Sequence, residues 1–320
     1  MRRAAGRKAI WAAVSAGLIA LALTYLLLNA GMDFDYVIPK RLVRLGAMLL
    51  GGLCIAWSAI IFQTLTNNRI LTPAVMGYEA VYLLLQSLLV LLLGTQSLAL
   101  LGASGNFALS VASMLAYSWV LHRWLFRDGA SNVYSLLLVG LVLTLVMGTF
   151  TQFVQFRTSP GEFSMLLGFT QASFNRAQPE QLLYACVIVA VVCAVGLRTL
   201  ATLDVLALGR ETAISLGVDY PRAVRLQLVL ISTLVAVSTS LLGPTAFMGI
   251  FVANMAYALA RSSRHRATLP MGCAIAIAIF IAAQLAVEHV FNYRTTVGIL
   301  VNLVCGAYFL ALVVRQRGAQ

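Results

Sequence analysis

The sequence predicts an all-α polytopic membrane protein with about ten transmembrane helices, and two observations support this fold class. Hydrophobic residues make up 61% of the 320 residues and charged residues only 10%, whereas soluble domains carry about 25% charged residues. Apolar runs near the length of a membrane-spanning helix, about 20 residues, recur along the whole chain. Only short polar stretches separate these runs, so we expect a single transmembrane domain over residues 1–320.

The apolar runs place the helices in order along the chain. The expected spans are residues 9–30, 43–64, 74–94, 104–125, 133–155, 181–200, 225–243, 246–260, 268–287 and 297–314. The first run follows basic residues, as in a signal peptide, but it is long for one. Residues 28–30 (LNA) also lack the small-x-small cleavage pattern. We therefore expect this run to be kept as the first helix.

Basic residues predict the orientation of these spans. With a cytoplasmic N-terminus, 16 of the 22 Lys and Arg residues fall on the inner side of the membrane, which agrees with the positive-inside rule. Ten spans then return the C-terminus to the same side, so both termini are expected in the cytoplasm.

The composition also argues against several classes of partner. The net charge of +12 comes from short basic clusters at the ends of apolar runs, which is typical of loops that hold a topology and not of a nucleic-acid-binding surface. The five cysteines lie inside apolar runs, with no CxxC pair and no His at metal-ligand spacing. We therefore expect no nucleic-acid partner, no metal site and no cofactor in this chain.

Three segments interrupt the helical pattern: residues 67–73, residues 158–161 and Gly243-Pro244. Non-helical backbone near membrane depth is tolerated only where protein or water satisfies its polar groups, so these breaks are candidate pathway-lining points. Ordinary loops outside the lipid are the alternative, above all for the break at Pro160. Glu79 is the one acid placed within an apolar run; we interpret it as facing water at a mouth of the pathway, with a substrate or proton site as the alternative.

The longest polar internal segment runs from residue 204 to residue 225. It predicts a short helix that Asp204 caps at its start and Gly217 ends, with Pro221 just beyond. At about 12 residues this helix is too short to span a bilayer, so we expect it to lie across the cytoplasmic face. There it can hold a soluble partner or merely anchor on lipid.

Four stretches carry a family resemblance in their order and spacing. Residues 208–218 read LGRETAISLGV, residues 243–254 read GPTAFMGIFVAN, residues 264–266 read RHR and residues 296–299 read TVGI. They resemble the LG-x3-A-x2-LGV, GPIGFIGLIVPH, DHR and PVGI motifs of the membrane subunits of ATP-binding-cassette importers for siderophores, haem and vitamin B12. Ala253-Asn254 stands where the family has Pro-His. The resemblance covers nearly the whole chain.

This resemblance implies a permease subunit of an importer that moves an iron(III)-siderophore complex from the periplasm, or from a binding protein, into the cytoplasm. The sequence NNRILTP at residues 67–73 resembles that of a subgroup that handles catechol-type siderophores. Vitamin B12 or haem is the alternative cargo. The implied partners are a second permease subunit, the same or homologous, two ATP-binding subunits and a substrate-binding protein. The implied location is the bacterial inner membrane, and the chain itself is not expected to be an enzyme, since it has no G-x4-GK-[ST] phosphate loop.

The resemblance also assigns roles to individual residues. Residues matched to the coupling helix, which docks into the ATPase, are Leu208, Gly209, Arg210, Glu211, Ala213, Leu216 and Gly217. Arg41 and Arg44 match an R-L-P-R motif whose arginines meet acids of the binding protein, and exposed guanidiniums suit carboxylates; lipid headgroup anchoring is the alternative. Residues matched to the cytoplasmic gate are Asn68, Ile70, Ser131, Asn132, Val133 and Tyr134. Arg69 stands where the family motif has proline.

Two other classes of function are distant alternatives. Residues 102–105 (GASG) have the GxSG form of rhomboid proteases, but such a serine needs an imidazole within reach. His122 and His265 are expected on the cytoplasmic side, and His289 lacks the AHxxG context of rhomboids. An ion-coupled secondary transporter would explain the helix breaks, yet the apolar runs hold too few acids for one.

Overall fold

The computed structural model describes residues 2–28, 35–125, 133–245 and 247–317, and within these ranges it contains helices and no strand. The elements, in order, are α1 (Arg2–Leu27), α2 (Val37–Thr66), η1 (Pro73–Met76), α3 (Tyr78–Leu93), η2 (Gly94–Gln96), α4 (Ser97–Leu125), α5 (Val133–Gln155), α6 (Pro160–Thr170), η3 (Phe174–Arg176), α7 (Pro179–Arg198), α8 (Leu200–Leu206), α9 (Arg210–Ser215), α10 (Tyr220–Leu242), α11 (Met248–Ala260), α12 (His265–Leu285), the π-helical η4 (Ala286–Val290) and α13 (Val297–Arg317). The all-α prediction is therefore confirmed.

The long helices match the predicted apolar runs. In the described residues, seven helices are long and apolar enough to cross a membrane: α1, α2, α4, α5, α7, α10 and α12, the last continuing into η4. Three shorter apolar helices, α3, α11 and the first part of α13, coincide with the other expected runs. The chain is thus a polytopic membrane protein.

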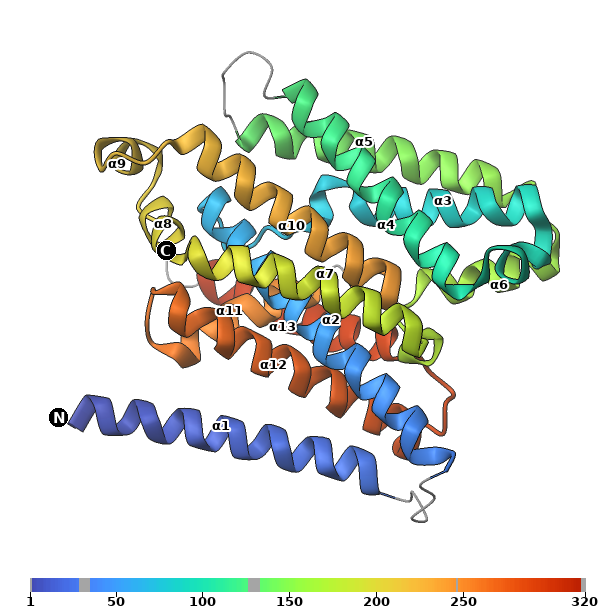
Figure 1. Ribbon diagram of the computed structural model, residues 1–320, viewed down its shortest axis with the longest axis horizontal. Helices are drawn as coiled ribbons and strands as arrows, with labels where there is room; N and C mark the ends of the chain where they lie inside the picture. The colour runs from blue at the N-terminus through green and yellow to red at the C-terminus, as the bar shows by residue number, and fades with distance from the viewer. Residues whose placement is uncertain (1, 29–34, 126–132, 246, 318–320) are drawn as a thin grey trace.

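Helix α2 forms the centre of the bundle, and α10, α11 and α12 pack against it (Figure 1). In its apolar window 78% of the residues are buried, against 6% in α1, which runs along the edge of the bundle beside α12. Gly52 allows this close packing, because a Cβ atom there would lie only 2.8 Å from Ile277 Cγ1 and 3.0 Å from the Ile277 backbone nitrogen. Small residues at such contacts let membrane helices approach closely.

The break at Pro160 starts a helix that the sequence analysis does not predict. Ser159 Oγ accepts the N–H of Glu162, and the Glu162 carboxylate accepts the N–H of Ser159 at 2.8 Å. This capping box, with Pro160 in the first turn, is a strong helix start. The hydrogen bond from the Ser159 N–H also lowers the pKa of Glu162. Helix α6 has only 11 residues and lies at one end of the bundle.

The two ends of the bundle differ in what they carry. Helix α1 begins and α13 ends at the same end of the bundle as α8 and α9, whereas α6 lies at the opposite end (Figure 1). We call these the α9 end and the α6 end.

The packing of α2 predicts a large difference between two glycine substitutions. Gly52→Val should lower the free energy of unfolding by about 1–3 kcal/mol, because the branched side chain overpacks the contact with α12. Gly17→Val, in the exposed α1, should leave it nearly unchanged, since nothing lies within 4 Å of a Cβ atom at Gly17. Denaturation of the two purified variants in detergent measures the difference, and equal stabilities would contradict this packing.

Candidate functional site

The polar segment at the α9 end forms two short helices and not the single helix that was predicted. Gly209 separates α8 from α9 with φ of 97° and ψ of 165°, a conformation that strongly favours glycine. The prediction that Asp204 caps the start of the helix is wrong, because Asp204 lies inside α8.

The end of α9 agrees with the prediction for Gly217, which has φ of 82°. The Gly217 N–H donates to Ile214 O at 2.9 Å, and the Val218 N–H donates to Ala213 O at 3.0 Å. These two bonds form a Schellman motif, which requires a residue in the left-handed region just after the helix. Gly217 therefore ends α9 for a backbone reason.

The α8–α9 segment presents an apolar surface. Ala213 is fully buried, while the side chains of Leu208, Ile214 and Leu216 are 60%, 51% and 60% exposed. Among the other residues predicted for coupling, Arg210 and Glu211 are exposed. Exposed apolar side chains on a short, firmly ended helix are suited to contact with another protein. The predicted coupling residues thus lie together on one surface segment.

Helix α8 is tied to the membrane helices through a chain of side chains that the sequence analysis missed. Asp204 Oδ1 accepts the backbone N–H of His265 at 2.9 Å and lies 2.6 Å from His265 Nδ1. His265 Nε2 lies 2.8 Å from Thr64 Oγ1. These side-chain contacts join α8 to the first residue of α12 and to the last turns of α2. Asp204 and the histidine of the RHR motif are both polar residues that the sequence analysis noted. Because they are 61 residues apart, no local pattern predicts that they are in contact.

The turn after α2 holds the predicted gate residues Asn68 and Ile70. Asn68 Oδ1 accepts the Ile70 N–H at 2.9 Å, and the Ile70 side chain is 38% exposed. The carbonyl oxygen of Arg69 accepts hydrogen bonds from Gln63 Nε2 at 2.9 Å and from Asn254 Nδ2 at 3.0 Å. Asn254, which replaces the histidine of the family motif, therefore holds this turn.

The second predicted gate segment is only partly described. Val133 and Tyr134 begin α5, and Ser131 and Asn132 lie outside the described residues. Their gate role stays a prediction.

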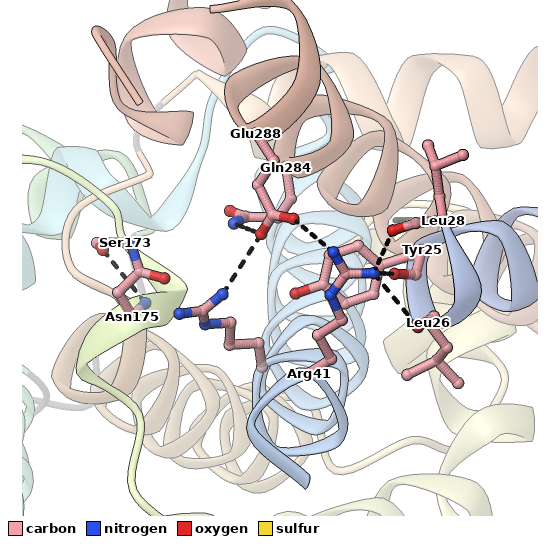
Figure 2. A network of polar contacts seen from close by, with 9 residues as sticks. Tyr25, Leu26, Leu28, Arg41, Ser173, Asn175, Gln284 and Glu288 are labelled. Atoms are coloured by element: carbon pink, nitrogen blue, oxygen red, sulfur yellow. Dashed lines mark hydrogen bonds and ion pairs between the residues drawn. The ribbon is translucent and has the colours of Figure 1, made fainter. Parts of the chain in front are cut away.

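The prediction that Arg41 is an exposed arginine of the outer face is wrong in its exposure, because the side chain is buried. Arg41 is 8% exposed, and its Nη1 donates to the carbonyl oxygens of Tyr25 at 2.8 Å and Leu28 at 2.7 Å, with a longer contact to Leu26 at 3.3 Å. The guanidinium thus satisfies the last carbonyl groups of α1, where helices leave acceptors unpaired. Its position facing the end of α1 is shown in Figure 2.

Both arginines also meet one buried acid. Glu288, whose side chain is 4% exposed, lies 3.7 Å from Arg41 Nη2 and 3.4 Å from Arg44 Nη1. Gln284 Nε2 donates to Glu288 Oε1 at 2.6 Å (Figure 2). Arg44, at 25% side-chain exposure, keeps some access to solvent. The RLVR motif therefore joins α1, α2 and η4, a role that its resemblance to a docking motif did not reveal.

Glu79 lies against the break between α10 and α11. Its Oε1 accepts the N–H of Thr245 at 2.9 Å, just after Gly243 ends α10 with φ of 102°. On the other side of this break, Arg176 Nη2 donates to Leu242 O at 2.9 Å and Gln171 O at 2.8 Å. The Glu79 carboxylate therefore bonds to backbone freed at this break, and Glu79, which is partly exposed, also lines a small pocket with Thr245 and Gly249. Its position at a mouth of the pathway stays a prediction.

Comparisons with known proteins agree with this arrangement. A model described as the FecCD transport family matches residues 7–315. The chain is 34% identical over 284 residues to the petrobactin import system permease protein YclO of Bacillus subtilis (strain 168), covering 89% of this chain and 90% of that protein. It is 28% identical over 280 residues to the hemin transport system permease protein HmuU of Yersinia pestis, covering 87% and 82%.

A solved structure shares the fold. This structure, an inward-facing conformation of a metal-chelate type ABC transporter, superposes with a TM-score of 0.84 at 18% identity, over 96% of this chain and 99% of that one. The similarity extends along nearly the whole chain.

The buried carboxylate of Glu288 makes a sharp stability prediction. Glu288→Gln removes the counter-charge of two guanidiniums, so the free energy of unfolding should fall by about 3 kcal/mol. Glu180→Gln is the matched control, because the exposed Glu180 carboxylate accepts a hydrogen bond only from the Ser104 hydroxyl among the described residues, at 3.0 Å. Loss of its charge should cost about 0–1 kcal/mol. Chemical denaturation in detergent compares them, and a Glu288→Gln protein as stable as the control would refute the proposed importance of this network.

Proposed function

The chain belongs to the FecCD transport family, and we propose that it is a permease subunit of an ATP-driven importer that carries ferric siderophore complexes across the bacterial inner membrane. The observation that carries this proposal is the α8–α9 segment, which combines the family's coupling motif with an exposed apolar face and a firm Schellman ending at Gly217. A permease of this kind performs no covalent chemistry, and ATP is hydrolysed on a separate subunit.

The proposed topology has ten spans with both termini and the α8–α9 segment in the cytoplasm. Three apolar helices of 10–17 residues, added to the seven long ones, supply this number. The first helix begins and the last helix ends at the α9 end, and the excess of basic residues assigned to that side supports its cytoplasmic location. The α6 end then faces the periplasm or the cell exterior.

The proposed coupling route leads from the α8–α9 segment into the membrane. Two ATPases hold the exposed faces of two permease subunits, and movement of α8 acts on α12 and α2 through Asp204, His265 and Thr64, which are joined by contacts of 2.6 and 2.8 Å. Rigid-body movement of the helices on each side of the pathway would then alternate access to it.

Relatives support a siderophore over haem as the cargo. The petrobactin import permease is 34% identical to this chain and the hemin transport permease 28%. The NNRILTP turn, which resembles that of the catechol-siderophore subgroup, also favours a siderophore as the cargo.

Docking of a binding protein at the α6 end is proposed for Arg44 and not for Arg41, whose guanidinium is buried. The Arg44 side chain is partly exposed, and the exposed Lys40 lies one helical turn before it on α2. Both cations can meet acidic side chains of a soluble partner.

Uptake in cells tests the cargo directly. Cells lacking this gene should lose uptake of radioactive iron supplied as a catechol-type siderophore complex and keep uptake of labelled vitamin B12. Restoring the gene should restore iron uptake. Loss of vitamin uptake alone would refute the siderophore proposal while leaving an ATP-driven importer in place.

Substitution of Gly217 tests the coupling role. Gly217→Glu should abolish uptake and the stimulation of ATPase activity, because a side chain in the left-handed region costs about 1–2 kcal/mol and places a charge at the proposed interface. Gly217→Asn is the control, since asparagine tolerates this conformation and adds no charge; it should keep most of the activity. Normal activity in the Gly217→Glu importer would count against coupling through α9.

A further inference from the structure

A polar cavity of about 520 Å³ opens at the α9 end, beside the α8–α9 segment. Its walls are the last turns of α2, the turn after it, the second half of α11, the loop leading into α12, and Ala207 just after α8. This volume lies within the range of about 300–1,000 Å³ that small-molecule sites occupy. Its size therefore suits a small ligand better than a helix of a partner protein.

The lining of the cavity is cationic. Arg69 and Arg261 both contribute to it, and none of the lining residues, all of which the structure describes, is an acid. Asp204 lies behind the wall, where its Oδ1 accepts the backbone N–H of His265 and contacts the imidazole. Neither arginine forms an ion pair within the described ranges. The positive charge of this cavity is therefore not neutralised by the described part of the chain.

Contacts at Arg69 and the end of α11 at Arg261 position the two arginines at the cavity. The carbonyl of Arg69 is fixed by Gln63 and Asn254, and its guanidinium lies 5.1 Å from the centre of the Tyr257 ring. Arg261 ends α11 with φ of 46°, in the left-handed region that an arginine rarely occupies. Strained residues of this kind cluster at binding sites.

One buried acceptor in the wall indicates what else the ligand carries. Gln63 is 3% exposed, and its Oε1 has no hydrogen-bond partner among the described residues. The orientation of the amide is set by the hydrogen bond from Nε2 to Arg69 O at 2.9 Å, because a flipped amide would bring two acceptors together. An unsatisfied buried acceptor calls for a donor. Because this oxygen has almost no accessible surface, a ligand hydroxyl would supply that donor only after the Gln63 side chain shifts toward the cavity.

We propose that this cavity binds a small hydroxylated anion, with carboxylate or phosphate groups on Arg69 and Arg261 and a hydroxyl group donating to Gln63. Forked guanidiniums suit both kinds of anionic group. Such chemistry belongs both to metabolites of the cytoplasm and to ferric chelates leaving the pathway. The site itself does not depend on the cargo proposed above, since it is defined by binding and not by transport.

Direct binding tests the proposal on the full chain, assembled with its partner subunits in lipid nanodiscs. The probe is isocitrate, and tricarballylate is its matched control, because it has the same three carboxylates without the hydroxyl. Calorimetric titration should show isocitrate binding that weakens as salt is raised. Tricarballylate should bind about tenfold more weakly, because the Gln63 acceptor stays unsatisfied.

Variants test the two arginines. Arg261→Gly removes the cation at a φ of 46° that glycine adopts freely, and Arg69→Gln removes the other; each should weaken isocitrate binding by about tenfold or more. Arg266→Gln, which removes an exposed cation of α12 outside the cavity, should change nothing. No binding by the parent protein, or equal losses in Arg261→Gly and Arg266→Gln, would overturn the proposal.

Competition identifies the source of the ligand. Displacement of isocitrate by a catechol-type ferric siderophore would assign the cavity to cargo leaving the pathway, and absence of displacement would assign it to a cytoplasmic metabolite. Both results are consistent with an anion-binding site in this cavity, because they differ only in the source of the ligand. If iron uptake does not depend on this gene while isocitrate still binds, the import proposal fails and the anion site stands.

Discussion

Backbone N–H and C=O groups inside a bilayer need partners within the protein, and this requirement explains where the charged side chains of this chain lie. Arg41 donates to the last carbonyls of α1. Arg176 and Glu79 satisfy the two sides of the break between α10 and α11, one as donor to Leu242 O and the other as acceptor from the Thr245 N–H. Each charge thus completes a helix end and does not form a pathway of its own.

The same requirement shapes the centre of the bundle. Helix α2 is long, apolar and largely buried, and glycine at position 52 brings α12 against it. Because α12 also receives the contact from Asp204 at one end and supplies Gln284, beside Glu288 of η4, at the other, it links the two ends of the protein through one packed element. A bundle tied in this way is suited to move as a rigid body.

The α9 end combines two surfaces of different chemistry. The α8–α9 segment exposes Leu208, Ile214 and Leu216 and is firmly ended, as suits a protein contact, whereas the cavity beside it is polar and cationic. His265 lines the cavity and contacts Asp204 of α8 at 2.6 Å, so the two surfaces are joined by adjoining side chains. Arg69 and Asn254, both departures from the family motifs, line the cavity.

The sequence by itself determined the fold class, the positions of the apolar helices and the role of Gly217 in ending α9, because length, hydrophobicity and left-handed turns are local properties of the chain. The capping box at Ser159 and Glu162 was equally local and escaped notice, since Pro160 was interpreted as a break. Only the tertiary structure decided the partners of Arg41, Asp204 and Gln63. An arginine on the outer side was expected to face solvent, yet it meets Glu288, about 250 residues further along the chain. Contacts between residues so far apart in the sequence depend on how about ten apolar segments pack together. No local pattern of residues therefore predicts which two charged side chains will be buried together.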